Sequence, residues 1–341
     1  MNPRFLLFNI FAYLTVLSVS AKFTAVDTVV INKDDGTPLG ATITLPAESP
    51  AKALLVLASG SGSQDRDEQV FGHRPFRTLA EYLSQRGYAV ARFDDRGVGQ
   101  SGGDPSSVTA AVHISDLRAM LGVLDSIAGT GISKGIIGHS EGGSMAIRMA
   151  RGPQCDFIIT LGAPAWQGDS IIMSQARAVS VLLMGRWDGE NLQRRILDLV
   201  KSPVPTLLLR PQLYALLAGE LGPAAETTQG KELIAQQIEA LCSASYREMV
   251  RYNPESDIRA VAVPWLALNG DKDIQVLPAN LSTIAALNPA ADTRLLPSHN
   301  HLGQRCDTGL IQEYATISED LSPLVLETIA TWLDNTVRNG K

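Results

Sequence analysis

The sequence predicts an α/β protein with a mostly parallel sheet, and three patterns support this prediction. Short apolar runs alternate with amphipathic stretches, as expected when strands buried on both faces are joined by helices. A G-x-S-x-G motif, residues 138–142, lies between one apolar run and a helical stretch. A long segment with only helical patterns interrupts the alternation, which indicates a helical insertion acting as a lid.

The expected elements follow in a regular order. Residues 29–31 and 41–45 flank an Asp- and Gly-rich stretch and predict an antiparallel hairpin. Further strands are expected at 53–57, 88–93, 135–137, 157–161, 265–268 and 293–296. Helices are expected between them at 75–86, 112–128 and 144–150, and after them at 323–337. Such β-α-β repeats imply a parallel sheet with helices on both faces.

The helical insertion is expected over residues 164–254, so residues 22–163 and 255–341 form the core domain. Within the insertion, helices are predicted at 171–187, 191–199, 213–221 and 230–249. Leucine-rich stretches around Leu182, Leu207 and Leu213 are candidates either for lining a pocket or for packing the insertion onto the core, and we favour packing for most of them.

Residues 1–21 have the pattern of a secretory signal peptide. Arg4 precedes an apolar run over 5–19, and Ser20 and Ala21 supply a small-residue exit. An uncleaved membrane anchor is the alternative. No cysteine near this exit offers a site for lipid attachment. We therefore expect an exported protein, periplasmic or extracellular, with no stable membrane association after cleavage.

Charge and cysteine content narrow the class of protein. A formal net charge of −6, from 29 basic and 35 acidic residues, argues against a nucleic-acid partner, which requires a basic surface. Three cysteines are too few for a disulfide-built scaffold. A bridge between Cys242 and Cys306 is one alternative, and burial of all three as small hydrophobic residues is the other.

Ser140, at the centre of the G-x-S-x-G motif, is the candidate nucleophile. A serine hydroxyl needs a base within hydrogen-bond reach, and that base needs an acid to hold its tautomer. An acid-bearing turn with Asp271 and Asp273 follows the strand expected at 265–268, and a loop with His299 and His301 follows the last strand. The chain order of serine, acid and histidine is that of the α/β-hydrolases.

The chain resembles the α/β-hydrolases of the exported bacterial esterase and serine-aminopeptidase-like group, over about residues 29–337. Besides the G-x-S-x-G motif, the similar stretches are residues 59–67, 93–103, 252–254, 270–276 and 300–302. Ser63 and His299 depart from the group's pattern, which more often has proline and an apolar residue there. The resemblance implies an α/β-hydrolase fold with an eight-stranded, mostly parallel sheet.

The resemblance also selects among the candidate residues. His301 fits the Asn-His-Leu pattern and is preferred as the base over His299, while Asp273 lies three residues after the turn glycine and is preferred as the acid over Asp271. The backbone N–H groups of Glu141 and Ser61 are the expected oxyanion-hole donors, with Gly60 as the alternative to Ser61.

These residues predict a carboxylic-ester hydrolase that acts on a small-molecule ester through an acyl-enzyme and needs no cofactor. An exported serine peptidase or amidase is the alternative, because the same residues cleave amides. A catalytically silent binding protein with this fold is a third hypothesis. The sequence predicts neither the acyl specificity nor the oligomeric state.

Several other patterns have a structural explanation. Residues 97–102 match G-x-G-x-x-G, the pattern of a dinucleotide-binding turn, which also needs an acid about 20 residues later. The acid at that distance, Asp116, lies within a predicted helix. We therefore expect a tight turn pinned by Asp95 and Arg96. Residues 65–67 line the site mouth or form an internal ion-pair network. His73 and His113 are expected at the surface and His139 as a filler of the serine turn. No spacing typical of a metal site is seen.

Overall fold

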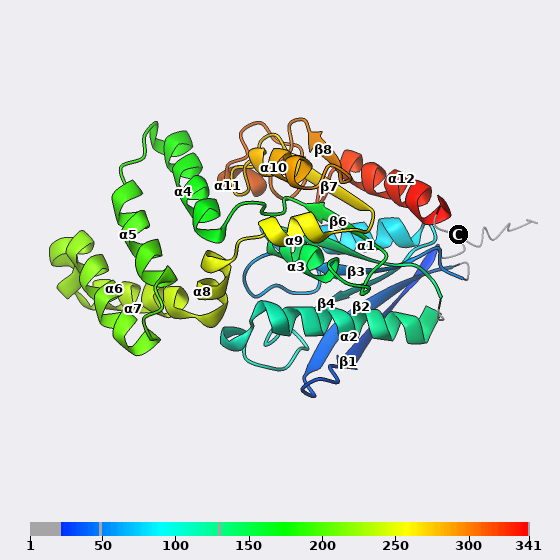
Figure 1. Cartoon of the computed structure of the whole chain (residues 1–341), viewed down its shortest axis with the longest axis horizontal. Coiled ribbons are helices and arrows are strands. Elements are labelled where there is room, and N and C mark those ends of the chain that lie inside the picture. The colour runs from blue at the N-terminus through cyan, green and yellow to red at the C-terminus, as the bar shows by residue number, and fades with distance from the viewer. Residues whose placement is uncertain (1–21, 48–49, 129–130, 340–341) are drawn as a thin grey trace, which may run out of the picture.

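The computed structural model describes residues 22–47, 50–128 and 131–339. Its centre is an eight-stranded sheet covered by helices (Figure 1). The strands are β1 (Phe23–Ile31), β2 (Pro38–Pro46), β3 (Leu54–Ala58), β4 (Ala89–Phe93), β5 (Lys134–His139), β6 (Phe157–Leu161), β7 (Trp265–Gly270) and β8 (Asp292–Leu296). The helices are α1 (Pro75–Ser84), α2 (Ala110–Ala128), α3 (Glu141–Met149), α4 (Gly168–Met184), α5 (Glu190–Lys201), α6 (Thr206–Leu221), α7 (Thr228–Cys242), α8 (Ala244–Arg251), α9 (Glu255–Ala260), α10 (Ala279–Leu287), α11 (Ile311–Tyr314) and α12 (Pro323–Asn339).

The sheet has the strand order β1-β2-β4-β3-β5-β6-β7-β8. β2 runs antiparallel to β1 and β4, and every neighbouring pair from β4 to β8 is parallel. The carboxyl ends of these parallel strands therefore meet at one edge, where ligands bind in open α/β sheets. The predicted eight-stranded α/β fold is confirmed.

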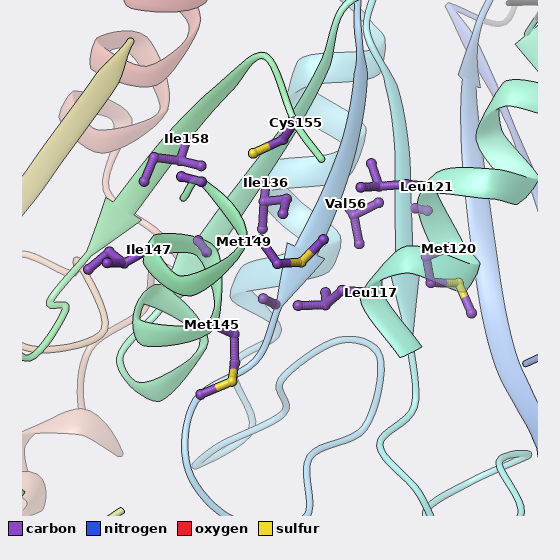
Figure 2. Close-up of a cluster of buried hydrophobic side chains, with 14 of the residues drawn as sticks. Val56, Leu117, Met120, Leu121, Ile136, Met145, Ile147, Met149, Cys155 and Ile158 are labelled. Atoms are coloured by element: carbon purple, nitrogen blue, oxygen red, sulfur yellow. The ribbon is translucent and has the colours of Figure 1, made fainter. Parts of the chain in front are cut away.

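Apolar side chains fill both faces of the sheet. On one face, Val56, Ile136 and Ile158 of three neighbouring strands pack under Leu117 of α2 and Met149 of α3 (Figure 2). On the opposite face, a second cluster includes side chains of α1 and α12. Full burial of one such side chain contributes about 1.5–3 kcal/mol. The two layers fix the sheet edge that carries the loops described below.

The helices α4 to α8 follow one another between β6 and β7 and stand to one side of the sheet (Figure 1). They enclose an apolar cluster of their own, which includes Leu213, Ile234 and Val250. Leu182 and Leu207 lie outside it and are 45% and 80% exposed. The expectation that these leucine-rich stretches pack against the core is therefore wrong.

Two boundaries in the insertion also differ from the prediction. The single helix expected at 230–249 is divided into α7 and α8, because the Ser243 hydroxyl accepts a hydrogen bond from the Tyr246 amide and starts a new helix. The helix expected to start at Leu213 starts at Thr206 and continues through Pro211. A proline within a helix removes one donor, but neighbouring turns retain their own hydrogen bonds.

The signal peptide predicted over residues 1–21 lies outside the described residues. In the part of the chain that the structure describes, no helix combines the length and apolarity needed to cross a membrane. Cys155, Cys242 and Cys306 are free and buried. The alternative of a bridge between Cys242 and Cys306 is thus wrong, and the cysteines pack as small hydrophobic side chains.

Candidate active site

Ser140 lies in a sharp turn between β5 and α3. Its φ of 53° and ψ of −120° are unusual for a residue other than glycine, as expected for a serine raised above the end of the sheet. The Ser140 amide donates to the carbonyl of Leu161 at 2.9 Å, which ties the turn to β6. A Cβ atom at Gly138 would lie 2.3 Å from the carbonyl oxygen of Gly142, so the turn closes only with glycine at that position.

The loops that follow β7 and β8 bring Asp273 and His301 together. Their side chains are joined by a hydrogen bond of 2.7 Å between His301 Nδ1 and Asp273 Oδ2. Asp273 Oδ1 accepts from the backbone amides of Gln275 and Val276, at 2.9 and 2.8 Å. Asp273 is 1% exposed and His301 is 4% exposed. The carboxylate is therefore held by three donors, and His301 keeps Nε2 for another partner.

Gly162, which follows β6, leaves room for this pair. It has a φ of +62°, and a Cβ at this position would lie 3.0 Å from His301 Nδ1 and 3.2 Å from Asp273 Oδ2. The backbone at Gly162 therefore lies closer to the imidazole and the carboxylate than an alanine methyl group fits without a shift of its neighbours. Glycine is favoured here for both its backbone conformation and its small size.

The other candidates for base and acid have different surroundings. His299 is buried, with Nδ1 hydrogen-bonded to the Pro297 carbonyl at 2.7 Å and Nε2 to the Ser322 hydroxyl at 2.8 Å. Both of its ring nitrogens are thus engaged away from Ser140. Asp271 accepts from the Ser298 amide at 2.6 Å and shapes the turn. Of the four residues, the structure brings only Asp273 and His301 together as an acid and base pair.

Two backbone N–H groups beside Ser140 are free to bind an oxyanion. Among the described residues, no acceptor faces the amides of Ser61 and Glu141, and both residues line the same cavity as Ser140. Glu141 is the first residue of α3, where helix N–H groups lack internal partners. The Gly60 amide instead donates to Glu68 Oε1 at 2.6 Å, so the alternative donor is already occupied.

Ser140 and His301 both line a cavity of about 760 Å³. Ile171 of α4 and Met249 of α8 line it from the insertion. Among the residues that the structure describes, no hydrogen bond joins Ser140 Oγ to the His301 ring. Catalytic hydrogen bonds are often long in ligand-free enzymes and shorten in the substrate complex. The cavity volume is typical of a small-molecule site.

The charged stretch at residues 65–67 forms an internal network and does not line the cavity. The Arg66 guanidinium donates two hydrogen bonds to Asp94, from Nε at 3.1 Å and from Nη2 at 2.7 Å, and the Arg66 amide donates a third at 2.8 Å. Asp67 pairs with Arg92. Burial opposes ionisation of Asp94, but the bonds from Arg66 outweigh it and lower the pKa of that carboxyl. This network fixes the turn that carries Ser61.

The glycine-rich turn at 97–102 is pinned differently from the prediction. Asp94 Oδ2, not Asp95, accepts from the Gln100 amide at 3.0 Å. Asp95 accepts instead from the Ser59 hydroxyl and the Gln64 amide, both at 2.9 Å, and so holds the turn beside Ser140. Burial raises the pKa of Asp95.

Asp116 of α2 makes a structural contact with the glycine-rich turn region. Asp116 forms a buried ion pair with Arg96, with Nη2 to Oδ1 at 2.7 Å. Asp116, the acid about 20 residues after the G-x-G-x-x-G motif, is therefore part of the internal packing.

Sequence reasoning missed two buried histidines. His73 is 7% exposed and bonds the Tyr314 carbonyl through Nε2 at 2.8 Å, so the expectation of a surface position is wrong. His139, treated as a filler, forms a buried pair with Glu68 at 2.8 Å. A histidine directly before Ser140 and an acid directly after the stretch 59–67 were the available signals. Within the described ranges, no group of three metal-binding side chains is arranged around a common point.

The fold and this arrangement define a class of hydrolase. The family model described as the alpha/beta hydrolase family matches residues 55–310, three quarters of the chain, and the protein belongs to that family. Esterase EstD of Thermotoga maritima is 24% identical over 148 residues, which span 41% of this chain and 34% of that relative. The match thus covers about a third of the relative's length.

Solved structures show the same fold. An esterase of Pyrococcus furiosus, Pf2001, aligns over 93% of this chain and 91% of its own, with 14% identity and a TM-score of 0.55. A proline iminopeptidase of Mycobacterium smegmatis aligns over 93% and 100%, with 15% identity and a TM-score of 0.57. Est1E of Butyrivibrio proteoclasticus, solved with ferulic acid, aligns over 91% and 99%, with 17% identity and a TM-score of 0.52.

Proposed function

We propose that the protein is a serine-dependent carboxylic-ester hydrolase, with Ser140 as nucleophile, His301 as base and Asp273 as the acid that orients it. The observation that carries this proposal is the buried Asp273–His301 hydrogen bond beside the strained turn that carries Ser140. The esterase names of EstD and Pf2001 add support. The signal-like residues 1–21 extend the proposal to an enzyme acting outside the cytoplasm.

Each residue has one role in the proposed reaction. Ser140 Oγ attacks the acyl carbon while His301 Nε2 takes the hydroxyl proton, and the alcohol leaves with that proton. Water then attacks the acyl-enzyme and gives a proton to His301, which passes it to Ser140 Oγ as the carboxylic acid is released. Asp273 stabilises the imidazolium in both steps.

The Ser61 and Glu141 amides receive the negative charge that develops on the carbonyl oxygen. One such donor contributes on the order of 3 kcal/mol to transition-state stabilisation. The turn at residues 59–64 therefore contributes to catalysis through the position of its backbone. Hydrogen bonds to Asp95 and to Glu68 hold that backbone in place.

The test is replacement of the nucleophile. Ser140→Ala is expected to abolish hydrolysis of a small aryl ester and labelling by a fluorophosphonate, with the thermal unfolding midpoint retained. Ser126→Ala, an exposed serine of α2, serves as the control and keeps full activity. Residual wild-type turnover in Ser140→Ala, or absence of labelling in the wild type, contradicts the proposal.

The peptidase alternative is separated by the bond that is cleaved. We expect turnover of an aryl ester to exceed turnover of matched peptide amides, because an amide is the harder bond. A purified protein that prefers the peptide amide falsifies the ester assignment while leaving the serine mechanism intact.

A further inference from the structure

A second carboxylate–imidazole pair, Glu68 and His139, lies next to Ser140 and lines the same cavity. His139 Nδ1 and Glu68 Oε1 are 2.8 Å apart, and the two residues are 7% and 3% exposed. His139 ends β5, next to Ser140, whereas Glu68 comes from the loop before α1. The proposed reaction assigns neither residue a proton, so this buried pair needs a separate explanation.

The pair connects the two loops that supply the reacting groups. Glu68 Oε1 also accepts from the Gly60 amide at 2.6 Å, in the turn that carries Ser61. On the other side, His139 Nε2 is 3.0 Å from the backbone carbonyl of His301. The rings of His139 and His301 lie 4.7 Å apart between centroids. A continuous chain of hydrogen bonds thus runs from the oxyanion turn to the main chain of the base.

The partners of His139 define its protonation. A carboxylate oxygen and a backbone carbonyl are both acceptors, so both ring nitrogens must carry hydrogen for both bonds to form. His139 is then an imidazolium paired with Glu68. Burial alone would lower the pKa of His139, but the Glu68 carboxylate and the His301 carbonyl outweigh it and raise that pKa. The negative charge of Asp273 also raises the pKa of His139, and that of Glu68 raises the pKa of Asp95.

Glu68 itself adopts an uncommon backbone conformation. Its φ is +52°, a value that favours glycine, and its amide donates to the Asp65 carbonyl at 2.9 Å. Such conformations persist where surrounding contacts hold them, and they cluster at functional sites. Here the contacts that hold Glu68 aim its carboxylate at both the Gly60 amide and the His139 ring.

We propose that Glu68 and His139 are positioning residues, whose ion pair holds the oxyanion turn at Gly60 in a fixed place relative to the main chain of His301. This inference rests on the proposed function. Both residues line the same cavity as Ser140, but the proposed reaction transfers no proton through either of them. Its contribution is to keep the Ser61 amide and the His301 ring aligned with Ser140, and to place a cation beside the base.

The first test needs no catalysis. Nitrogen-15 NMR of histidine-labelled wild-type protein at pH 8 is expected to show His139 with two N–H groups, although free histidine, with a pKa of about 6.5, is neutral there. His139→Gln provides the assignment. A His139 ring with a single N–H at pH 8 overturns the proposal, whether or not the protein hydrolyses esters.

The second test compares the pH profiles of two variants. Glu68→Gln removes the anion, and without it the buried His139 is expected to become neutral. The summed charge of the two residues is therefore unchanged, while one hydrogen bond is lost. His139→Gln removes only the cation, and the remaining Glu68 carboxylate stabilises protonated His301. We therefore expect kcat to fall roughly ten- to a hundredfold in both variants, with KM changed much less. The acid limb of kcat/KM moves to higher pH only in His139→Gln.

A matched control separates positioning from stability. His73 likewise lies between a carboxylate, Asp320, and a backbone carbonyl, that of Tyr314. His73→Gln is expected to lower the unfolding midpoint without moving the acid limb. Folded Glu68 and His139 variants with wild-type kcat and pH profile contradict the proposal. If these variants do not fold, the NMR measurement on the wild type still decides, and it is independent of the Ser140 test.

Discussion

Gly162→Ala tests whether the Asp273–His301 pair works as the proposed base and acid. A methyl group at this position would lie 3.0 Å from His301 Nδ1, whereas ordinary contacts of this kind are 3.4–4 Å. The imidazole must therefore move by about 0.4 Å or more. Because a misplacement of about 1 Å costs on the order of a hundredfold in rate, a shift of this size predicts a loss of roughly five- to tenfold in kcat.

The same substitution has a separate cost in stability. A non-glycine residue in the left-handed region costs about 1–2 kcal/mol. In a protein of this size each kcal/mol lowers the unfolding midpoint by about 2 °C. The stability effect is thus small, and the variant is expected to be folded at the temperature of the assay.

Gly36→Ala is the control for this backbone cost. Gly36 has a φ of +77°, and a Cβ there meets nothing within 4 Å. It is expected to lose stability as Gly162→Ala does, but to keep wild-type kcat. Steady-state kinetics with an aryl ester and thermal unfolding of both variants supply the comparison. Equal kcat values in the two variants would refute the reasoning, because a methyl group against the His301 ring would then have no effect on the rate.

Two further predictions concern stability. Ser243→Ala removes the side chain that caps α8, and is expected to cost about 1 kcal/mol, seen as faster amide hydrogen exchange in α8 and unchanged exchange in β5; equal acceleration in β5 would show that the insertion and the sheet open together. Glu313 binds the amides of residues 307–309, and although burial opposes its ionisation, these bonds lower its pKa to about 2. A lowered pKa stabilises the folded protein at pH values above the ordinary glutamate pKa, and this stabilisation is lost as the pH falls toward 2. Glu313→Gln should therefore flatten the acid side of the profile of unfolding midpoint against pH. An unchanged profile would contradict this assignment.

The sheet and the serine turn were predictable because their signals are local. The apolar run at 53–57 and the glycines around Ser140 constrain their own segments, whatever the rest of the chain does. The boundaries of α7 and α8 were less predictable. Ser243 is compatible with a helix interior or with a cap, and only the direction of the following chain decides between the two.

The partners of the buried polar groups depend on contacts distant in sequence. His299 and His301 are two residues apart, yet one faces Ser322 and the other faces Asp273. Glu68 and His139 are separated by 71 residues. A single sequence contains no periodicity that predicts such a pairing. The sequence therefore predicts His139 only as a filler of the serine turn, whereas its ring has two hydrogen-bond partners.

The separate apolar cluster of α4 to α8 has a consequence for how this enzyme changes over evolutionary time. The helices of the insertion pack mainly against one another. Substitutions inside their cluster can therefore change the part of the cavity that these helices line, while the edge of the sheet stays in place. Changes in the shape of the cavity can therefore arise in a part of the chain that packs separately from the strands and loops that carry Ser140, Asp273 and His301.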